Sequence, residues 1–197
     1  MAAKQLSVKA QMTRSSLVVA AAIILREEGP QAVTYRNVAK KAGAASSAVG
    51  YYFDSIDEVL KEAAEFNMRA WAERAEKAAD AAEAMAPEEA RAQVVALLLR
   101  ACLPEQFDVP AAHYAQLIMA AQSKVVTAVY RRGRVRLSEA NARILARAGY
   151  PEVDPSIVSA LVDGAAVAGI SEGNPVREVA RRVLTDAFDL LGASQSC

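Results

Sequence analysis

The chain has 197 residues and a mass of 20.9 kDa, and its 53% hydrophobic and 23% charged residues exclude a wholly disordered protein. Alanine occurs 44 times and aromatic residues make up only 6%, a balance that favours helices over strands. The net charge is zero, but residues 1–56 carry +4 and the remainder −4, which points to a basic nucleic-acid-binding segment on an acidic body.

The sequence carries few signals for membranes, disulfides or catalysis. No continuous apolar run approaches the roughly 18 residues that span a bilayer, and no segment resembles a signal peptide. The two cysteines, Cys102 and Cys197, are too few for a disulfide framework or a metal site. The low cysteine content favours a cytoplasmic protein with reduced thiols, and no membrane partner is expected. With a single histidine and no glycine-rich phosphate loop, we expect that it is not an enzyme and has no cofactor or metal. A serine, histidine and acid brought together by the fold stays open as an alternative.

The first predicted helix runs from Arg14 to Glu28, where apolar residues recur every three or four positions. Gly29-Pro30 marks its end, since glycine commonly follows a helix and proline cannot continue one. Residues 1–12 are polar and are expected to be loose.

Two short helices follow. Thr34 is placed to cap the first of them, with Val33 and Val38 as a hydrophobic staple, and Gly43 ends it after about two turns. The next helix is expected over Ser46–Phe53.

The rest of the chain reads as longer helices separated by proline and glycine. Ser55 and Glu58 have the spacing of a capping box, which predicts that a helix starts directly after Ser55. The sequence thus predicts an all-α fold of about nine helices, the later ones over residues 56–85, 88–103, 111–121, 123–148, 155–170 and 176–191.

The three short helices of the basic segment have the form of a helix-turn-helix. In that motif the helix after the tight turn, which is expected at Gly43, enters the major groove of DNA. Residues that face base edges should be small or able to form hydrogen bonds, and Ser46, Ser47 and Ala48 meet that need. The two tyrosines that follow add hydroxyls for phosphate contacts, which fix the register on the duplex.

Residues 14–60 resemble the DNA-binding head of the tetracycline-repressor (TetR) family of bacterial regulators, with no gap in the spacing. The resemblance covers about a quarter of the chain. The matching positions are Arg14, Leu17, Ala20-Ala21, Ile24-Leu25, Gly29, Thr34, Val38-Ala39, Ala42-Gly43, Val49, Tyr52-Phe53 and Glu58–Leu60.

Three positions depart from the family pattern. Ala45 stands where a serine or threonine cap is usual, Gly50 where a tyrosine is usual and Ile56 where a lysine is usual. In the family, the usual residues at the last two positions commonly touch phosphates. Because these two contacts are missing here, we expect other residues to replace them and Ser46 to supply the cap. The replacements are Thr34, Arg36, Tyr51, Tyr52 and the N-terminal arm with Lys4 and Lys9. The expected DNA contacts are Thr34, Tyr35, Arg36, Ser46, Ser47, Ala48, Tyr51 and Tyr52.

For the body, the resemblance implies a small-molecule effector and a homodimer formed through the last two helices. Small residues spaced four apart would let a second helix approach closely, and two helices from each subunit would form a four-helix bundle. The alternative is that both helices pack within one chain. The expected dimer residues are Ala160, Gly164, Ala168, Val183, Ala187 and Leu190. Candidate effector residues, each of which also suits a core position, are Phe66, Met68, Trp71, Phe107, His113, Tyr114, Leu117, Met119, Tyr130 and Asn141.

The sequence therefore predicts a ligand-responsive transcriptional regulator with a DNA-binding domain over residues 1–56 and an effector-binding and dimerisation domain over residues 57–197. The expected action is repression, relieved when an effector shifts the long helix after Ser55 and changes the spacing of the two heads. A transcriptional activator of the same fold, and a helical DNA-binding or interaction protein without an effector, are the alternatives.

Overall fold

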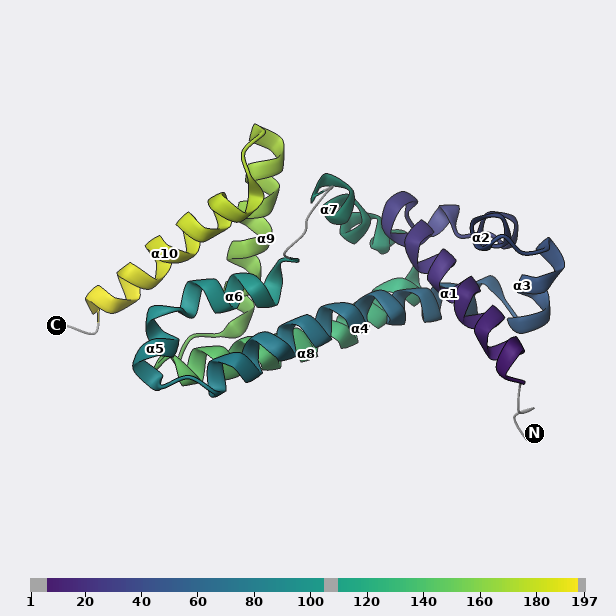
Figure 1. The fold of residues 1–197 in the computed structure, drawn as a ribbon. Coiled ribbons are helices and arrows are strands. Elements are labelled where there is room, and N and C mark those ends of the chain that lie inside the picture. Colours follow the sequence, from purple (N-terminus) through teal and green to yellow (C-terminus); the bar gives the residue numbers. More distant parts are fainter. Residues whose placement is uncertain (1–6, 105–109, 195–197) are drawn as a thin grey trace. The chain divides into compact units, whose positions relative to one another are not determined.

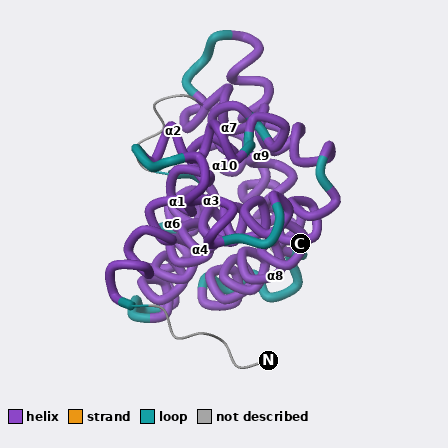
Figure 2. Tube along the Cα trace, turned by 90° about the vertical axis from the view of Figure 1, so that its right-hand side faces the viewer, coloured by secondary structure: helices purple, strands orange, loops and turns teal. Residues whose placement is uncertain are grey.

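The computed structural model describes residues 7–104 and 110–194. All the regular structure in these residues is helical (Figures 1 and 2), which confirms the all-α prediction. The α-helices are α1 (Val8–Glu28), α2 (Tyr35–Ala42), α3 (Ser46–Tyr52), α4 (Ile56–Glu83), α5 (Pro87–Ala92), α6 (Val94–Cys102), α7 (Pro110–Met119), α8 (Lys124–Arg147), α9 (Pro155–Glu172) and α10 (Val176–Ser194). Two 3-10 turns, η1 (Pro30–Ala32) and η2 (Ala120–Gln122), join them.

Internal contacts divide the chain into two compact units. The head unit contains residues 1–69 and 112–131, and the body unit contains residues 70–111 and 132–197. The segment that carries most of α7 and the start of α8 therefore packs with the N-terminal helices. The predicted functional boundary after residue 56 stays a prediction.

In the head unit, α1 packs against α2 and α3. Its face of Leu17, Ala21 and Leu25 is at most 1% exposed, as the helical spacing of apolar residues predicts. The helix begins at Val8, because the Ser7 hydroxyl accepts a hydrogen bond from the Ala10 N–H at 3.3 Å. The expectation of a loose N-terminus is thus wrong for residues 8–12.

By length and composition, α1 is the one helix among the described residues that is apolar enough to cross a membrane. Residues 8–28 are not continuously apolar, because serine, threonine and arginine interrupt the apolar residues of this helix. Burial of its apolar face in the head unit accounts for this composition, since core helices pass the same test.

The caps around α2 follow the sequence closely. The Asn37 N–H donates to the Thr34 hydroxyl at 3.2 Å, and Val33 and Val38 are both buried. Gly43 ends α2 with φ 66°, in the left-handed region that glycine adopts without strain. At α3 the expectation is wrong: the capping position is Ala45, which offers no side-chain acceptor, and Ser46 is the first helical residue.

The start of α4 is a capping box. The Glu58 N–H donates to the Ser55 hydroxyl at 3.2 Å, as the spacing predicts. The Glu58 carboxylate in turn accepts a hydrogen bond from the Asp54 N–H at 2.8 Å. The pair fixes the turn between α3 and α4 on both sides.

In the body unit, α9 and α10 pack against each other, and α6 packs against both. The single helix predicted over residues 88–103 is two helices, because Gln93 leaves the helical conformation with φ −106° and ψ 8°. Leu98, Ile144 and Leu184 are fully buried in this unit. Its core therefore draws on α6, α8 and α10.

The arginines near the middle of α8 lie on a solvated face. Arg136 pairs with Glu76 at 2.5 Å, and Arg134 pairs with Asp163 at 3.1 Å. Exposed pairs of this kind contribute about 0–1 kcal/mol each. They link α8 to its neighbours without forming a buried charge.

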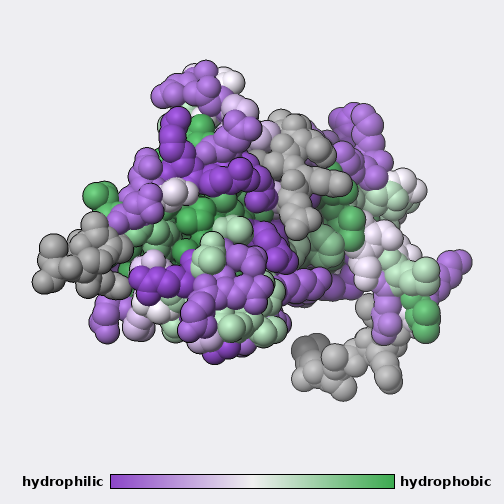
Figure 3. Space-filling model, turned by 60° about the vertical axis from the view of Figure 1, so that its left-hand side comes forward, coloured by the Kyte–Doolittle hydropathy of each residue, from purple (hydrophilic) through white to green (hydrophobic). Residues whose placement is uncertain are grey.

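Apolar side chains also remain on the surface of the body unit. Ile157 and Val167 on α9 are about half exposed, and Leu190 on α10 is 72% exposed. Figure 3 shows apolar side chains among the polar surface close to the end of α10. Large apolar residues that gather on a surface commonly mark an interaction site.

Candidate nucleic-acid interface and effector residues

The second helix of the helix-turn-helix, α3, buries one side and exposes the other. Val49 is fully buried and Phe53, directly after the helix, is 2% exposed, so these two residues anchor α3 in the head unit. The Tyr51 side chain is 71% exposed, and its ring meets the Tyr52 ring edge-on at 4.9 Å between centroids. The outward side of α3 is therefore available to enter the major groove of DNA, which is wide enough to admit one α-helix.

Every residue expected to touch DNA keeps some exposure. Tyr35 lies at the first position of α2, and its ring is 3.8 Å from the point where a Cβ on Gly50 would lie. This contact joins the start of α2 to α3. The exposed members of the set are Thr34, Arg36, Ser46, Ser47 and Tyr51, and the half-buried members are Tyr35, Ala48 and Tyr52.

Arg14 of α1 holds the frame behind α3. Its guanidinium forms a two-pronged ion pair with Glu62, at 2.6 Å for the Nη1–Oε2 contact, and reaches Glu58 at 3.3 Å. The same group lies 4.6 Å from the centroid of the Phe53 ring. Hydrogen bonding to Glu62 raises the pKa of Arg14 above its ordinary value. Arg14 thus ties α1 to α4 and to the end of α3.

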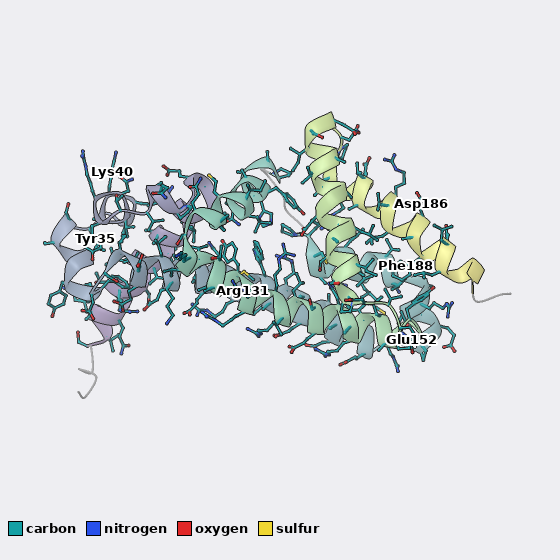
Figure 4. The ribbon with its side chains drawn as sticks, turned by 180° about the vertical axis from the view of Figure 1, so that it is seen from behind. Tyr35, Lys40, Arg131, Glu152, Asp186 and Phe188 are labelled. Carbon is teal, nitrogen blue, oxygen red and sulfur yellow. The ribbon has the colours of Figure 1, made fainter. Side chains whose placement is uncertain are left out.

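Some of the Lys and Arg side chains on the head surface form ion pairs, and others do not. Lys41 is held by Glu27 of α1 at 3.1 Å. Arg36 and Lys40 make no ion pair with any described residue, and Lys40 extends away from the ribbon in Figure 4. Unpaired cations such as these can bind phosphate without first giving up a partner.

A groove of about 780 Å³ opens in the head unit and was not foreseen from the sequence. We call it the α2–α4 groove, because it lies between the starts of these two helices and also takes in the start of α8. It is lined by Pro30, Gln31, Val33, Thr34, Tyr35, Ile56, Asp57, Leu60, Gln122, Ser123, Lys124 and Val125. The segments that form it are up to about ninety residues apart, so no local pattern could have revealed it.

The expected effector residues divide between the two units. In the head unit, Met68, Tyr114 and Tyr130 are buried, His113, Leu117 and Met119 are half-buried, and Phe66 is 39% exposed. In the body unit, Trp71 is half-buried and Asn141 is fully buried. Phe107 lies outside the described residues.

Sequence reasoning missed Gln116 of α7, a buried polar residue of the head unit. Its side chain is 2% exposed, and its Oε1 accepts a hydrogen bond from the Tyr130 hydroxyl at 2.8 Å. Its Nε2 has no acceptor among the described residues. Burial raises the pKa of Tyr130 to about 12. Gln116 is four residues from the buried Ala120, a helical spacing that could have identified it as inward-facing.

In the body unit, the Asn141 side chain contacts Cys102. Its Nδ2 lies 3.5 Å from the Cys102 sulfur, and the Arg74 guanidinium approaches the Cys102 carbonyl at 3.4 Å. Desolvation raises the pKa of the Cys102 thiol to about 11. Among the described residues, no group of three or more histidine, cysteine, aspartate or glutamate side chains is placed to hold a metal.

The expected dimer residues lie on the outward sides of α9 and α10. Ala160 and Gly164 are exposed and Ala168 is half-buried, while Val162 and Ala166 of α9 face the core. On α10, Val183 and Ala187 are half-buried and Leu190 is exposed. An apolar groove of about 480 Å³ continues this surface, lined by Glu152, Val153, Asp154, Ile157, Ala187, Leu190 and Leu191. Figure 4 labels Glu152, at the edge of this groove.

Phe188 distinguishes the two sides of α10. Its ring is 7% exposed and meets Tyr150 at 4.9 Å between centroids, whereas Leu190, two residues later, is exposed. The buried stripe of α10 is thus Val176, Val179, Ala180, Leu184 and Phe188. The expected dimer residues of α10, Val183, Ala187 and Leu190, are not part of this stripe.

Two family models match the chain. The model for bacterial regulatory proteins of the tetR family matches residues 17–63, and the model for the tetracyclin repressor-like C-terminal domain matches residues 86–190. No curated protein matches the sequence.

Solved structures share the fold at low sequence identity. A TetR transcription regulator from Haloarcula marismortui is 18% identical, with 91% of this chain and 98% of that chain covered and a TM-score of 0.68. SmeT, the repressor of the Stenotrophomonas maltophilia multidrug efflux pump SmeDEF, is 19% identical, with coverages of 89% and 88% and a TM-score of 0.58. A protein from Saccharomonospora viridis, solved in complex with choline, is 16% identical, with coverages of 89% and 95% and a TM-score of 0.67. Since the C-terminal family model alone spans more than half of the sequence and the N-terminal model covers the helix-turn-helix, this chain is a transcriptional regulator of the TetR family.

Proposed function

We propose that this protein represses transcription in the cytoplasm by binding duplex operator DNA as a homodimer, and that a small-molecule effector releases it. Residues 1–56 form the DNA-binding domain in this proposal, and residues 57–197 bind the effector and the second subunit. The protein acts by binding alone, with no catalytic step. The alternatives of an activator or an effector-free DNA-binding protein have no specific observation in their favour.

The observation that carries DNA binding is the outward side of α3. Ser46 and Ser47 are exposed at the start of the helix, where hydroxyls can donate to or accept from base edges in the major groove. Thr34 and Arg36 beside them, with the hydroxyl of Tyr51, are suited to phosphates on either side. The contacts thus divide into base readout by α3 and backbone positioning by its neighbours.

The decisive experiment is selection from a pool of random duplexes. A dimer of helix-turn-helix proteins should enrich an inverted repeat whose half-sites are about one helical turn apart, since the two recognition helices enter successive major grooves. The variant Ser47→Glu should lose the enriched sequence, because its carboxylate would face the electronegative groove. The variant Ala92→Glu, exposed in the body unit, is the matched control and should retain it. Recovery of no common sequence with the wild-type protein would contradict the proposal.

A second copy of the chain is the partner that the outward sides of α9 and α10 fit. Both helices bury one side in their own chain and still present apolar or small residues on the other. Packing within one chain would leave Ile157 and Leu190 exposed, whereas a two-fold bundle would cover them. Members of the family generally form dimers, which supports the same partner.

The effector site is supported by the unsatisfied amide of Gln116. A buried donor without an acceptor costs about 1–3 kcal/mol, and an effector with an acceptor oxygen would recover that free energy. The Saccharomonospora viridis protein in complex with choline shows that a chain of this fold binds a small molecule. We therefore place the effector beside Gln116 and Tyr130.

The effector proposal is tested by a thermal-shift screen of choline and neutral carbonyl compounds. A true effector should raise the melting temperature of the wild-type protein and lower its affinity for the selected duplex. The variant Gln116→Leu should still bind that duplex but should lose the thermal shift. A compound that stabilises both proteins equally would place the binding site elsewhere.

A further inference from the structure

The α2–α4 groove brings together residues from three distant parts of the head unit. Thr34 and Tyr35 lie at the start of α2, Ile56 at the start of α4 and Lys124 at the start of α8. Two of these residues, Thr34 and Tyr35, belong to the set expected to bind DNA. The groove therefore connects the expected DNA surface with a segment far outside the helix-turn-helix.

Lys124 is the one cation among the residues that line this groove. Its side chain is exposed and makes neither a hydrogen bond nor an ion pair with any described residue. Asp57 also lines the groove, but it lies in the first turn of α4, where a negative charge is favoured by the helix. Lys41, by contrast, is neutralised by Glu27 at 3.1 Å.

A second residue that lines the groove, Ile56, shows why a positive charge there would matter for DNA binding. Ile56 is half-buried and lines the same groove, at the position where the family resemblance leads one to expect a lysine that touches phosphate. An isoleucine cannot bind phosphate. The lysine that lines this groove is Lys124, which belongs to α8 and not to α4.

We propose that Lys124 is a DNA-phosphate contact that supplies the positive charge missing at position 56. The Lys124 ammonium binds a backbone phosphate beside the one reached from the start of α2, and a lysine does this as a point charge without reading sequence. This inference rests on the proposed DNA binding. It adds to the DNA surface a residue that lies more than sixty positions beyond the helix-turn-helix.

The salt dependence of binding tests the proposal. Fluorescence anisotropy with the selected duplex and with a random-sequence duplex gives the slope of log K against log salt. Each phosphate contact contributes about 0.9 to that slope, so Lys124→Gln should lower it by about 0.9 for each protomer. The affinity should fall by a similar factor on both duplexes. The control Lys77→Gln, exposed on the body-unit part of α4, should leave slope and affinity unchanged.

A rescue variant separates a phosphate contact from a general loss of structure. Adding Ile56→Lys to Lys124→Gln returns an ammonium to the same groove and should restore the slope, with circular dichroism confirming an unchanged helix content. An unchanged slope in Lys124→Gln, with wild-type binding intact, overturns this inference alone. A loss confined to the selected duplex also overturns it, since phosphate contacts do not depend on sequence. Absence of any duplex binding by the wild-type protein overturns the proposed function as well.

Discussion

Arg14 connects three elements of the head unit through two kinds of contact. Its guanidinium pairs with Glu62 and Glu58 on α4 and lies over the ring of Phe53, which ends α3. Because Phe53 anchors α3 in the core, Arg14 influences the position of the proposed recognition helix without touching DNA. Its side chain is 28% exposed, so solvent screens these interactions only partly.

Replacing Arg14 with glutamine should lower the free energy of unfolding by about 1–3 kcal/mol, because Glu62 loses its two-pronged partner and Phe53 its cation. Urea denaturation followed by circular dichroism measures this loss. Arg26→Gln is the matched control on the same helix, since Arg26 is exposed and forms no ion pair among the described residues. Equal losses in the two variants would show that the Arg14 contacts add nothing.

Cys102 makes the stability of the protein depend on pH in the alkaline range. Its thiol has a pKa of about 11 in the folded protein, raised from 9.0 mainly by desolvation. The unfolded chain therefore loses this proton first as the pH rises. The contribution of the neutral thiol is complete below pH 9.0 and is lost as the pH approaches about 11.

The variant Cys102→Ala removes this titration and isolates its effect. The free energy of unfolding of the wild-type protein, relative to the variant, should fall by about 2 kcal/mol between about pH 8 and pH 11. Tyr130 titrates in both proteins and cancels in the difference. Urea curves collected across this range measure the difference, and a constant difference would contradict a raised thiol pKa.

Two glycines end helices of the head unit in different ways. Gly29 follows α1 with φ 84° and ψ 176°, a region that essentially only glycine occupies, and an added Cβ would lie 2.9 Å from the Met119 sulfur. Gly43 follows α2 in the left-handed helical region, and an added Cβ would meet no atom within 4 Å.

These settings predict an order of sensitivity. Gly29→Ala should lower the free energy of unfolding by about 2–3 kcal/mol, through backbone strain and displacement of the Met119 side chain. Gly43→Ala should cost only about 1 kcal/mol, since backbone conformation is its sole penalty. Chemical denaturation of the two variants side by side measures the order, and equal or reversed losses would contradict it.

At the scale of elements, features fixed by neighbouring residues could be predicted from the sequence. Thr34 caps α2 and Ser55 pairs with Glu58, because the partners in each hydrogen bond are three residues apart. The left-handed turn at Gly43 needs only the freedom of glycine. These local rules identify helix boundaries independently of tertiary packing.

Other features have no local signal in the sequence and were not predictable in this way. The break at Gln93 interrupts a pattern that reads as one continuous helix. Lys124 approaches Ile56 and Thr34 only after the chain has folded. Gln116 has the sequence environment of any polar helical residue, and its unsatisfied amide appears only when burial is known. The part of the candidate site outside the helix-turn-helix therefore required the structure.

At the scale of the molecule, the body unit exposes small and apolar residues on α9 and α10. Ala160 and Gly164 would allow a second helix to approach α9 closely, and Leu190 supplies a large apolar side chain at the end of α10. A two-fold axis through this surface would bring each residue against the same surface of the partner. Dimerisation also matters for DNA, because two linked heads bind two half-sites more tightly than one.

A charge in this surface should separate the subunits without unfolding them. Leu190→Glu introduces a carboxylate at a position that is 72% exposed in one chain, so the helix content of the protomer should not change. Burying that unpaired charge against the partner would cost several kcal/mol, enough to convert a dimer into a 20.9 kDa monomer. Sedimentation or light scattering measures the mass.

The DNA affinity of the same variant connects the surface to function. Monomeric Leu190→Glu should bind a duplex with two half-sites no more tightly than a duplex with one, because the gain from linking the two heads is lost. The control Val135→Glu replaces another exposed apolar residue, on α8, and should remain a dimer with the affinity of the wild-type protein. If Leu190→Glu stays dimeric, or if both variants dissociate, the partner surface is not the outward side of α9 and α10. The spacing of the two recognition helices would then be set by another contact.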